Sequence, residues 1–149
     1  MKVQPYGSYD PAIAAQFIAL WEGKRLTAYR CSAGIWTIGY GHTKGVREGD
    51  TCSEEQAHQW LIEDIQSHVN QLSHYINVPV TENEFIALTS LAFNVGVTAV
   101  SRSALLHKLN AGDTEAAATE FLDFCYAGGK RVKGLVNRRK AEYELFTTD

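Results

Sequence analysis

The chain has 149 residues, of which 45% are hydrophobic and 21% are charged, and its formal net charge is −3 at pH 7. This length suits one domain or two small lobes joined by a long helix, and it can fold without a disulfide or a metal. The acidic balance argues against nucleic acid as a partner. A basic cluster near the C-terminus is either a solvated helix face or a binding patch for an anionic surface. It comprises Lys130, Arg131, Lys133, Arg138, Arg139 and Lys140.

The three cysteines, Cys31, Cys52 and Cys125, are an odd number at long spacings. This pattern matches neither a disulfide framework nor a zinc site, so at least one thiol is free, which suits a reducing compartment. We expect no metal and no cofactor. No basic region leads into a long apolar run at the N-terminus, so we expect no signal peptide. The apolar stretch 12–21 is too short for a membrane anchor.

The first predicted helix begins at Asp10 and Pro11, because aspartate caps a helix N-terminus and proline suits the first turn. Apolar side chains recur at helical spacing through Trp21, and Gly23 is expected to end the helix. Glu22 is therefore predicted at the helix C-terminus. The negative end of the helix dipole lies there and disfavours an ionised carboxyl group, which can keep an acid protonated.

The next segment changes to alternating periodicity and predicts a β-hairpin over residues 26–40 with a three-residue loop. This loop would pair Cys31 with Ile35 and Tyr29 with Thr37. Because side chains alternate along a strand, Cys31 and Thr37 would then project from the same face.

Two glycines and a histidine close the hairpin. We expect Gly39 and Gly41 to permit a close backbone approach or an unusual turn, not to form a phosphate-binding loop. His42 could transfer protons, but a structural role, held by a hydrogen bond or an ion pair, is the favoured interpretation.

The remainder of the chain is predicted to be helical. A long helix begins at a capping box, Ser53 to Gln56, and carries one apolar stripe. The stripe consists of Ala57, Leu61, Ile65, Val69 and Leu72. A second box, Thr81 to Glu84, opens a largely apolar helix that should be central and should stop at Gly96. Shorter helices are predicted at about 102–111, 113–126 and 135–146.

These elements predict an α+β fold, mostly helical, with a small N-terminal β-hairpin lobe beside a C-terminal helical lobe. We expect residues 1–149 to form a single domain. The hairpin lobe would span about 23–52, and the helical lobe about 73–149 together with the N-terminal helix. A long helix at about 53–72 would connect the two lobes.

The segments 21–31 and 34–42 together closely resemble the phage lysozymes of glycoside hydrolase family 24. The signature of that family is Glu, eight residues, Asp or Cys, five residues, then Thr. Glu22, Cys31 and Thr37 match it. The similarity continues at 93–96 and 129–139 and ends at 141–142 and 145–146, so it covers nearly the whole chain and implies a lysozyme-like fold.

The resemblance implies roles for the three signature residues. Glu22 would be the proton donor, Cys31 occupies the place where many members carry a second catalytic Asp, and Thr37 would hold the attacking water. The family is associated with inversion at the anomeric carbon, which requires roughly 6.5–9.5 Å between the two groups to seat a water. A thiol is ordinarily protonated at neutral pH, so Cys31 could orient water, act as a minor base or act as a nucleophile. Without the motif it would be interpreted as a small core residue.

Three further positions match residues that line the family's cleft. Phe93 and Asn94 fall on its floor, although Phe93 could equally be core. Arg138 matches the basic residue that approaches the catalytic Glu, where it would orient the carboxyl group and release it when sugar binds. His42 is kept with these as a substrate-binding or supporting residue.

The implied function is that of an endolysin. It would hydrolyse the β-1,4 bond between N-acetylmuramic acid and N-acetylglucosamine in bacterial peptidoglycan, causing lysis of the host cell. Related enzymes wait in the host cytoplasm until a holin opens the inner membrane, then reach the periplasm and cell wall. We expect a monomer, and its dependence on a holin for access to the wall implies no direct contact between the two proteins. The alternatives are a catalytically silent peptidoglycan-binding module, which intact Glu22 and Thr37 argue against, and a chitinase-like enzyme.

Overall fold

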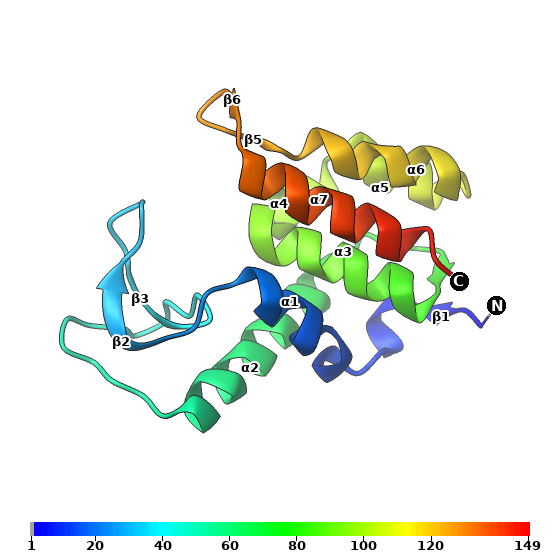
Figure 1. The fold of residues 1–149 in the computed structure, drawn as a ribbon. Helices are drawn as coiled ribbons and strands as arrows, with labels where there is room; N and C mark the ends of the chain where they lie inside the picture. Colours follow the sequence, from blue (N-terminus) through cyan, green and yellow to red (C-terminus); the bar gives the residue numbers. More distant parts are fainter. Residues whose placement is uncertain (1) are drawn as a thin grey trace.

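The structure, a computed structural model that describes residues 2–149, has the predicted α+β class, with short β-hairpins beside a larger group of helices (Figure 1). The N-terminal part contains β1 (Gln4–Pro5), η1 (Tyr6–Ser8), η2 (Pro11–Ala14) and α1 (Ala15–Trp21). Asp10 caps this segment as predicted, since its carboxylate accepts a hydrogen bond from the Ala12 N–H at 2.9 Å. The first turn is 3-10, and the α-helix proper begins only at Ala15.

The predicted β-hairpin forms from β2 (Arg25–Arg30) and β3 (Trp36–Gly39). Its register is the predicted one, because Tyr29 pairs with Thr37 and the Cys31 N–H donates to the Ile35 carbonyl at 3.0 Å. Cys31 and Thr37 consequently lie on the same face of the hairpin.

Two long helices follow, α2 (Glu54–Leu72) and α3 (Glu82–Val95), and the short strand β4 (Pro79–Val80) pairs with β1 between them. The Ser53 hydroxyl caps α2, and the complete Thr81–Glu84 capping box opens α3. Gly96 ends α3 at a φ of 96°, as predicted. The predicted stripe of α2 is buried along its whole length, so periodicity identified the inner face of this helix correctly.

The C-terminal part differs from the sequence prediction in two places. Its elements are α4 (Val97–Ser101), α5 (Ala104–Asn110), α6 (Thr114–Glu120), η3 (Phe121–Asp123), β5 (Tyr126–Ala127), β6 (Lys130–Arg131) and α7 (Lys133–Phe146). The prediction of a helix at 113–126 was wrong beyond Asp123. There Gly128 and Gly129, both at positive φ, turn the chain into the β5–β6 hairpin. Helix α4, which the prediction lacked, follows directly after Gly96.

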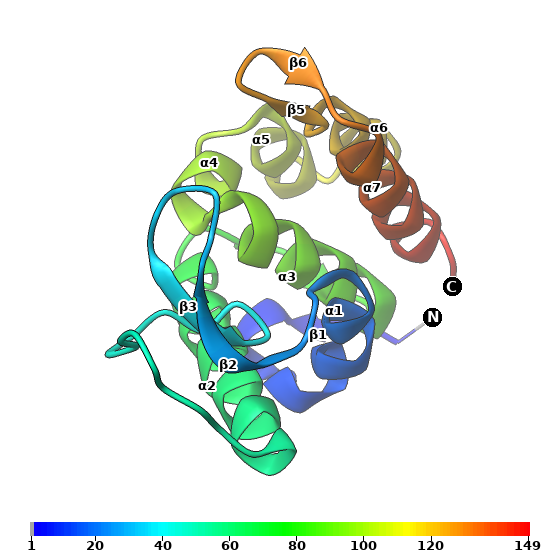
Figure 2. The same ribbon diagram turned by 60° about the vertical axis from the view of Figure 1, so that its left-hand side comes forward.

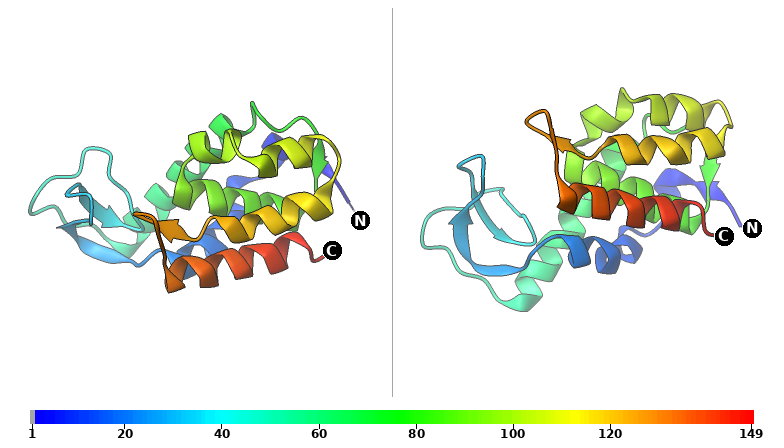
Figure 3. Two further views of the ribbon diagram at one scale, coloured as in Figure 1. Left: turned by 90° about the horizontal axis from the view of Figure 1, so that it is seen from above. Right: turned by 45° about the horizontal axis from the view of Figure 1, so that its top comes forward.

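The arrangement in space puts α3 at the centre, with α7 alongside it and α2 crossing beneath (Figures 1 and 2). The β2–β3 hairpin lies to one side of this group, attached through α1 and the start of α2. Figure 3 shows that the β2–β3 and β5–β6 hairpins project at the same end of the helices. The hydrophobic core lies between α2, α3, α5 and α7, where Leu61, Leu88 and Leu105 are almost fully buried. The chain therefore leaves α1 at the junction between the hairpin and the core.

Candidate active site

Glu22 lies at that junction. Helix α1 ends at Trp21, one residue before Glu22, and Gly23 is not needed to end it. The Glu22 N–H still donates to the Ile18 carbonyl at 3.0 Å, but its own backbone is extended, with φ −93° and ψ 122°. The chain thus turns out of the helix at Glu22 itself. Its side chain is 21% exposed, so the carboxyl group is held by the protein and remains accessible to a ligand.

The Glu22 carboxylate forms an ion pair with Arg138 of α7. Nη1 of Arg138 donates to Oε2 of Glu22 at 2.6 Å, and the Arg138 side chain is only 5% exposed. Low exposure to water strengthens such a charge-assisted bond and fixes its direction. One carboxylate oxygen is therefore held by Arg138.

Arg138 is held in turn by buried groups on α3 and α7. Its Nη2 donates to the Ser90 carbonyl at 3.2 Å, and its Nε lies 3.3 Å from Oε2 of Glu142. The Ser90 hydroxyl donates to that same Glu142 oxygen at 2.5 Å. Arg139 binds Glu142 from the other side, with Nε 2.6 Å from Oε1 and Nη2 2.9 Å from Oε2.

Burial and opposite charge act against each other at this cluster. Both Glu142 and Arg139 have fully buried side chains. Burial raises the pKa of Glu142, and Arg139, Ser90 and Arg138 oppose that shift. Burial likewise lowers the pKa of Arg139, and Glu142 opposes it. For both groups the net pKa shift is toward the neutral form, and the charged partners reduce that shift.

A tight glycine loop closes over the other oxygen of Glu22. Ile38 and His42 exchange two backbone hydrogen bonds of 2.9 Å, which leaves Gly39, Tyr40 and Gly41 as a short loop. Gly41 has φ +86°, and a Cβ there would lie 3.3 Å from Oε1 of Glu22. Gly39 has φ +68° and lies against Ala57 of α2. Both glycines thus allow the close approach and unusual turn expected from the sequence.

His42 is a buried anchor of the hairpin. Its Nδ1 lies 2.9 Å from the Asp64 carboxylate, and its ring stacks on Trp60 with centroids 4.6 Å apart and an interplanar angle of 4°. Both partners belong to α2. This agrees with the structural interpretation of His42, because the contacts attach the loop over Glu22 to the long helix.

Cys31 and Thr37 lie together on the hairpin. The Thr37 side chain is buried, and its hydroxyl donates to the Ile35 carbonyl at 2.9 Å. Backbone groups of Ile35 and Ala33 lower the pKa of the Cys31 thiol. Cys31 is therefore more acidic than an ordinary cysteine.

The other two cysteines have different surroundings. Desolvation raises the pKa of Cys52, which lies just before the cap of α2. Cys125 is 4% exposed and lies in the link between η3 and β5, not in a helix as the sequence suggested. Cys31, Cys52 and Cys125 are all free thiols.

Phe93 and Asn94 point to different surroundings at the end of α3. The Phe93 ring is half-buried against His68, with centroids 5.0 Å apart, so it contributes to packing. Asn94 is exposed and lines a groove of about 490 Å³ with Phe124, Tyr126 and Leu135. Of these two residues, only Asn94 lies on an open surface.

Residues 2–149 contain no group of three or more His, Cys, Asp or Glu side chains that could hold a metal ion. No helix in the same range is long and apolar enough to cross a membrane.

Sequence reasoning missed the buried support of Arg138. Ser90 lies within a largely apolar helix, and nothing in its local sequence singles it out. The one available signal was the spacing of four residues between Arg138 and Glu142, which places the two side chains on one helix face. The Ser90 contact spans 48 residues of sequence and has no local signature.

The fold and the partly exposed carboxyl group beside a hairpin are those of a lysozyme-type glycoside hydrolase. The family described as Phage lysozyme matches residues 19–142. The chain therefore belongs to the phage lysozyme family, whose endolysins degrade bacterial peptidoglycan.

Individual relatives agree with this assignment. The chain is 47% identical over 133 residues to an endolysin of Acyrthosiphon pisum secondary endosymbiont phage 1, covering 87% of this chain and 91% of that one. The muramidase domain of SpmX from Asticaccaulis excentricus superposes with a TM-score of 0.86 at 33% identity, covering 92% and 96%. The endolysin of Escherichia coli O157:H7 phage FAHEc1 gives 0.79 at 36% identity, covering 99% and 94%.

The loop over Glu22 gives a testable prediction. Gly41→Ala should reduce turnover by about ten- to a hundredfold, because the added Cβ displaces the carboxyl group. It should also lower the free energy of unfolding by about 1–2 kcal/mol through the positive φ. Gly45→Ala is the matched control, since Gly45 has φ +71° but nothing within 4 Å of its Cβ position. Both variants should lose similar stability in urea titrations. Equal activity in the two would show that Gly41 does not position Glu22.

Proposed function

We propose that this chain is an endolysin that hydrolyses the β-1,4 bond between N-acetylmuramic acid and N-acetylglucosamine, with Glu22 as general acid. The observation that carries the proposal is the placement of Glu22. Its carboxyl group is oriented by an arginine at 2.6 Å and yet is 21% exposed. A general acid needs this combination, a fixed direction together with access to the substrate.

In the proposed reaction, the carboxyl proton of Glu22 passes to the glycosidic oxygen as the bond from that oxygen to the anomeric carbon breaks. A water molecule adds to the anomeric carbon from the opposite face and gives up one proton to the Cys31 sulfur or to solvent, and Glu22 then regains a proton from solvent. This order of events inverts the configuration at the anomeric carbon. Binding of the sugar would release Glu22 from Arg138, so that the carboxyl group can face the leaving oxygen.

Cys31 and Thr37 are proposed to position that water. The lowered pKa of Cys31 favours a sulfur that can accept a hydrogen bond from water or take up its proton. The hydroxyl of Thr37 donates to the Ile35 carbonyl, which leaves its oxygen lone pairs free to accept. Thr37 would thus hold the water as an acceptor.

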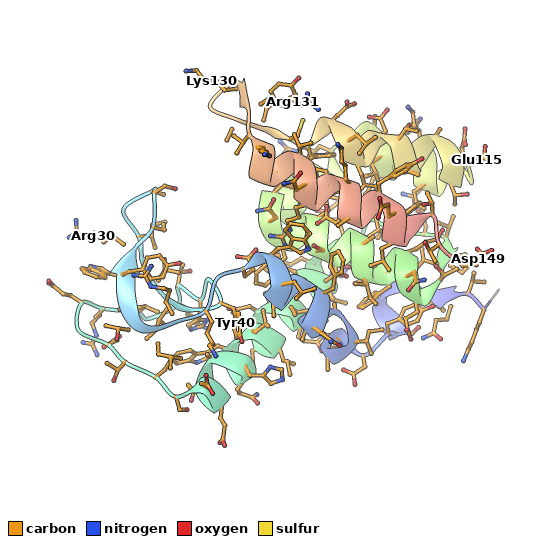
Figure 4. All side chains as sticks on the ribbon, viewed as in Figure 1. Arg30, Tyr40, Glu115, Lys130, Arg131 and Asp149 are labelled. Carbon is orange, nitrogen blue, oxygen red and sulfur yellow. The ribbon has the colours of Figure 1, made fainter. Side chains whose placement is uncertain are left out.

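We propose that the chain works as one domain of two lobes, with the bond to be cleaved bound between the hairpin lobe and the helical lobe. The exposed Asn94 would contact the glycan, and Phe93 and His42 would support the site through packing. Arg30 on one hairpin and Lys130 and Arg131 on the other extend outward at the same end of the molecule (Figure 4). They would lie beside a bound strand of peptidoglycan.

The first prediction from this proposal concerns the acid. Glu22→Gln keeps the shape of the side chain but cannot deliver a proton, so lysis of permeabilised cells should fall by at least about a hundredfold. Glu55→Gln, an exposed change in the first turn of α2, is the control and should be fully active. Mass spectrometry of digested peptidoglycan should find N-acetylmuramic acid at the reducing end. Near-normal activity of Glu22→Gln would refute the assignment and leave a different catalytic acid to be found.

The second prediction concerns Cys31. Because its pKa is lowered and that of Cys52 is raised, Cys31 should form thiolate at lower pH and react faster with iodoacetamide at neutral pH. Buried Cys125 should react last. Modification of Cys31 should abolish lysis by filling the space for water. Peptide mass spectrometry over a range of pH values would follow each thiol.

Variants of Cys31 separate a chemical role from simple packing. Cys31→Asp should keep substantial activity and resist the reagent, whereas Cys31→Ala should lose roughly ten- to a thousandfold. Fully active Cys31→Ala, together with alkylated enzyme that still lyses cells, would leave Cys31 as a packing residue. Magnetic resonance of the first-formed product would distinguish inversion from a covalent route through the thiol, which retains configuration.

The third prediction concerns access to the wall. We propose that the enzyme waits in the host cytoplasm as a monomer until a holin opens the inner membrane; its three free thiols fit a reducing compartment. Expression alone should leave cells intact, and co-expression of an unrelated holin should cause prompt lysis. Rapid lysis without a holin, at equal protein level, would argue for another route of export.

A further inference from the structure

We infer that Glu142, with Ser90 and Arg139, is a positioning group for the reaction, which holds Arg138 against Glu22 and balances its charge. This inference rests on the proposed role of Glu22. Arg138 receives one contact from the exposed side, Glu22, and the others from buried groups on α3 and α7. The buried contacts leave only Nη1 directed at Glu22.

The geometry leaves Arg138 little freedom. Its Nε lies 3.3 Å from Glu142 and 3.4 Å from the Ser90 hydroxyl, and its Nη2 lies 3.2 Å from the Ser90 carbonyl. Helix α3, which carries Ser90, packs closely along α7 (Figures 1 and 2). A planar guanidinium fixed at two of its nitrogens has a fixed orientation at the third.

Stability alone is a weak reason for this cluster. Burial of charged groups costs several kcal/mol per ion, and apolar replacements of buried ion pairs are often neutral or stabilising. The chain nevertheless keeps three charged side chains at 0–5% exposure directly behind Glu22. Their position directly behind Glu22 therefore points to a role in the site and not to a role in folding.

The charges of this cluster balance one another. The cluster holds two carboxylates, Glu22 and Glu142, and two guanidinium groups, Arg138 and Arg139. An arginine without Glu142 behind it would be a stronger cation toward Glu22 and would favour its ionised form, which cannot donate a proton. Glu142 therefore balances the charge of Arg138 while Arg138 orients the carboxyl group of Glu22.

Other groups face the cluster without an equivalent contact. On the far side of Glu22, Lys24, Tyr40 and His58 line an open groove, and Lys24 is ion-paired with Glu54. The Cys125 thiol lies near Arg139, whose Nη1 also reaches the Phe124 carbonyl at 3.4 Å. Through this last bond the cluster is also attached to the base of the β5–β6 hairpin.

The test compares variants by their pH–activity profiles on permeabilised cells. Glu142→Gln removes one charge and should lower kcat about tenfold. The loss of its activity at alkaline pH should begin about half a pH unit below that of the wild type. A directly adjoining charge shifts a pKa by ~1–3, so this shift is the smaller one. Glu144→Gln, an exposed change on the same helix, should match the wild type. The double variant Arg139→Gln, Glu142→Gln restores charge balance, so its profile should return toward that of the wild type.

Circular dichroism would establish that each variant is folded before rates are compared. A uniform loss in Glu142→Gln without a shift of the profile, or the same shift in the double variant, would overturn the inference. If Glu142→Gln does not fold, Ser90→Ala and the double variant test the inference in its place. Ser90→Ala keeps every charge and should reduce kcat with an unshifted profile, and wild-type kcat in it would overturn the positioning role. Failure of the proposed function would be distinguishable from failure of this inference, because Glu22→Gln would then remain active.

Discussion

The ion pair between Glu22 and Arg138 is the interaction on which the arrangement of this enzyme depends. It joins the end of α1 to α7, across 116 residues of sequence, at the point where the hairpin meets the helices. A carboxyl group at a helix end in open solvent would sample many orientations. Here one oxygen is fixed by a guanidinium at 2.6 Å, and the other lies under the Gly41 backbone.

Three layers of structure support that one carboxyl group. The closest layer is Arg138, with the Gly39–Gly41 loop opposite. Behind Arg138 are Ser90 and Glu142, and the loop is anchored in a comparable way by His42, which stacks on Trp60 and pairs with Asp64. The third layer is the apolar core, whose helices α2, α3 and α7 carry these anchors. A site built in this way fixes the direction of the Glu22 carboxyl group and leaves that group partly exposed.

The β2–β3 hairpin contributes to the site through local structure, unlike the helices. Cys31 and Thr37 are brought together by strand register, which is a local property, and the acidity of the thiol comes mainly from backbone groups of the turn. An ordinary thiol is protonated at neutral pH, and the backbone groups of the turn between β2 and β3 lower the pKa of Cys31.

The sequence by itself determined the features with local causes: the capped helices α2 and α3, the buried stripe of α2, the stop at Gly96 and the hairpin register. It also indicated Glu22, Cys31 and Thr37, because their spacing is a family signature. It failed at 124–131, since strands of two residues leave almost no periodic pattern and only the Gly128–Gly129 turn marks them. The resemblance also placed Arg138 near Glu22, and the structure has that contact. Only the tertiary structure decided which buried groups hold Arg138 there. Its contact to Ser90 joins segments 48 residues apart, and no periodicity within a helix encodes a contact between helices.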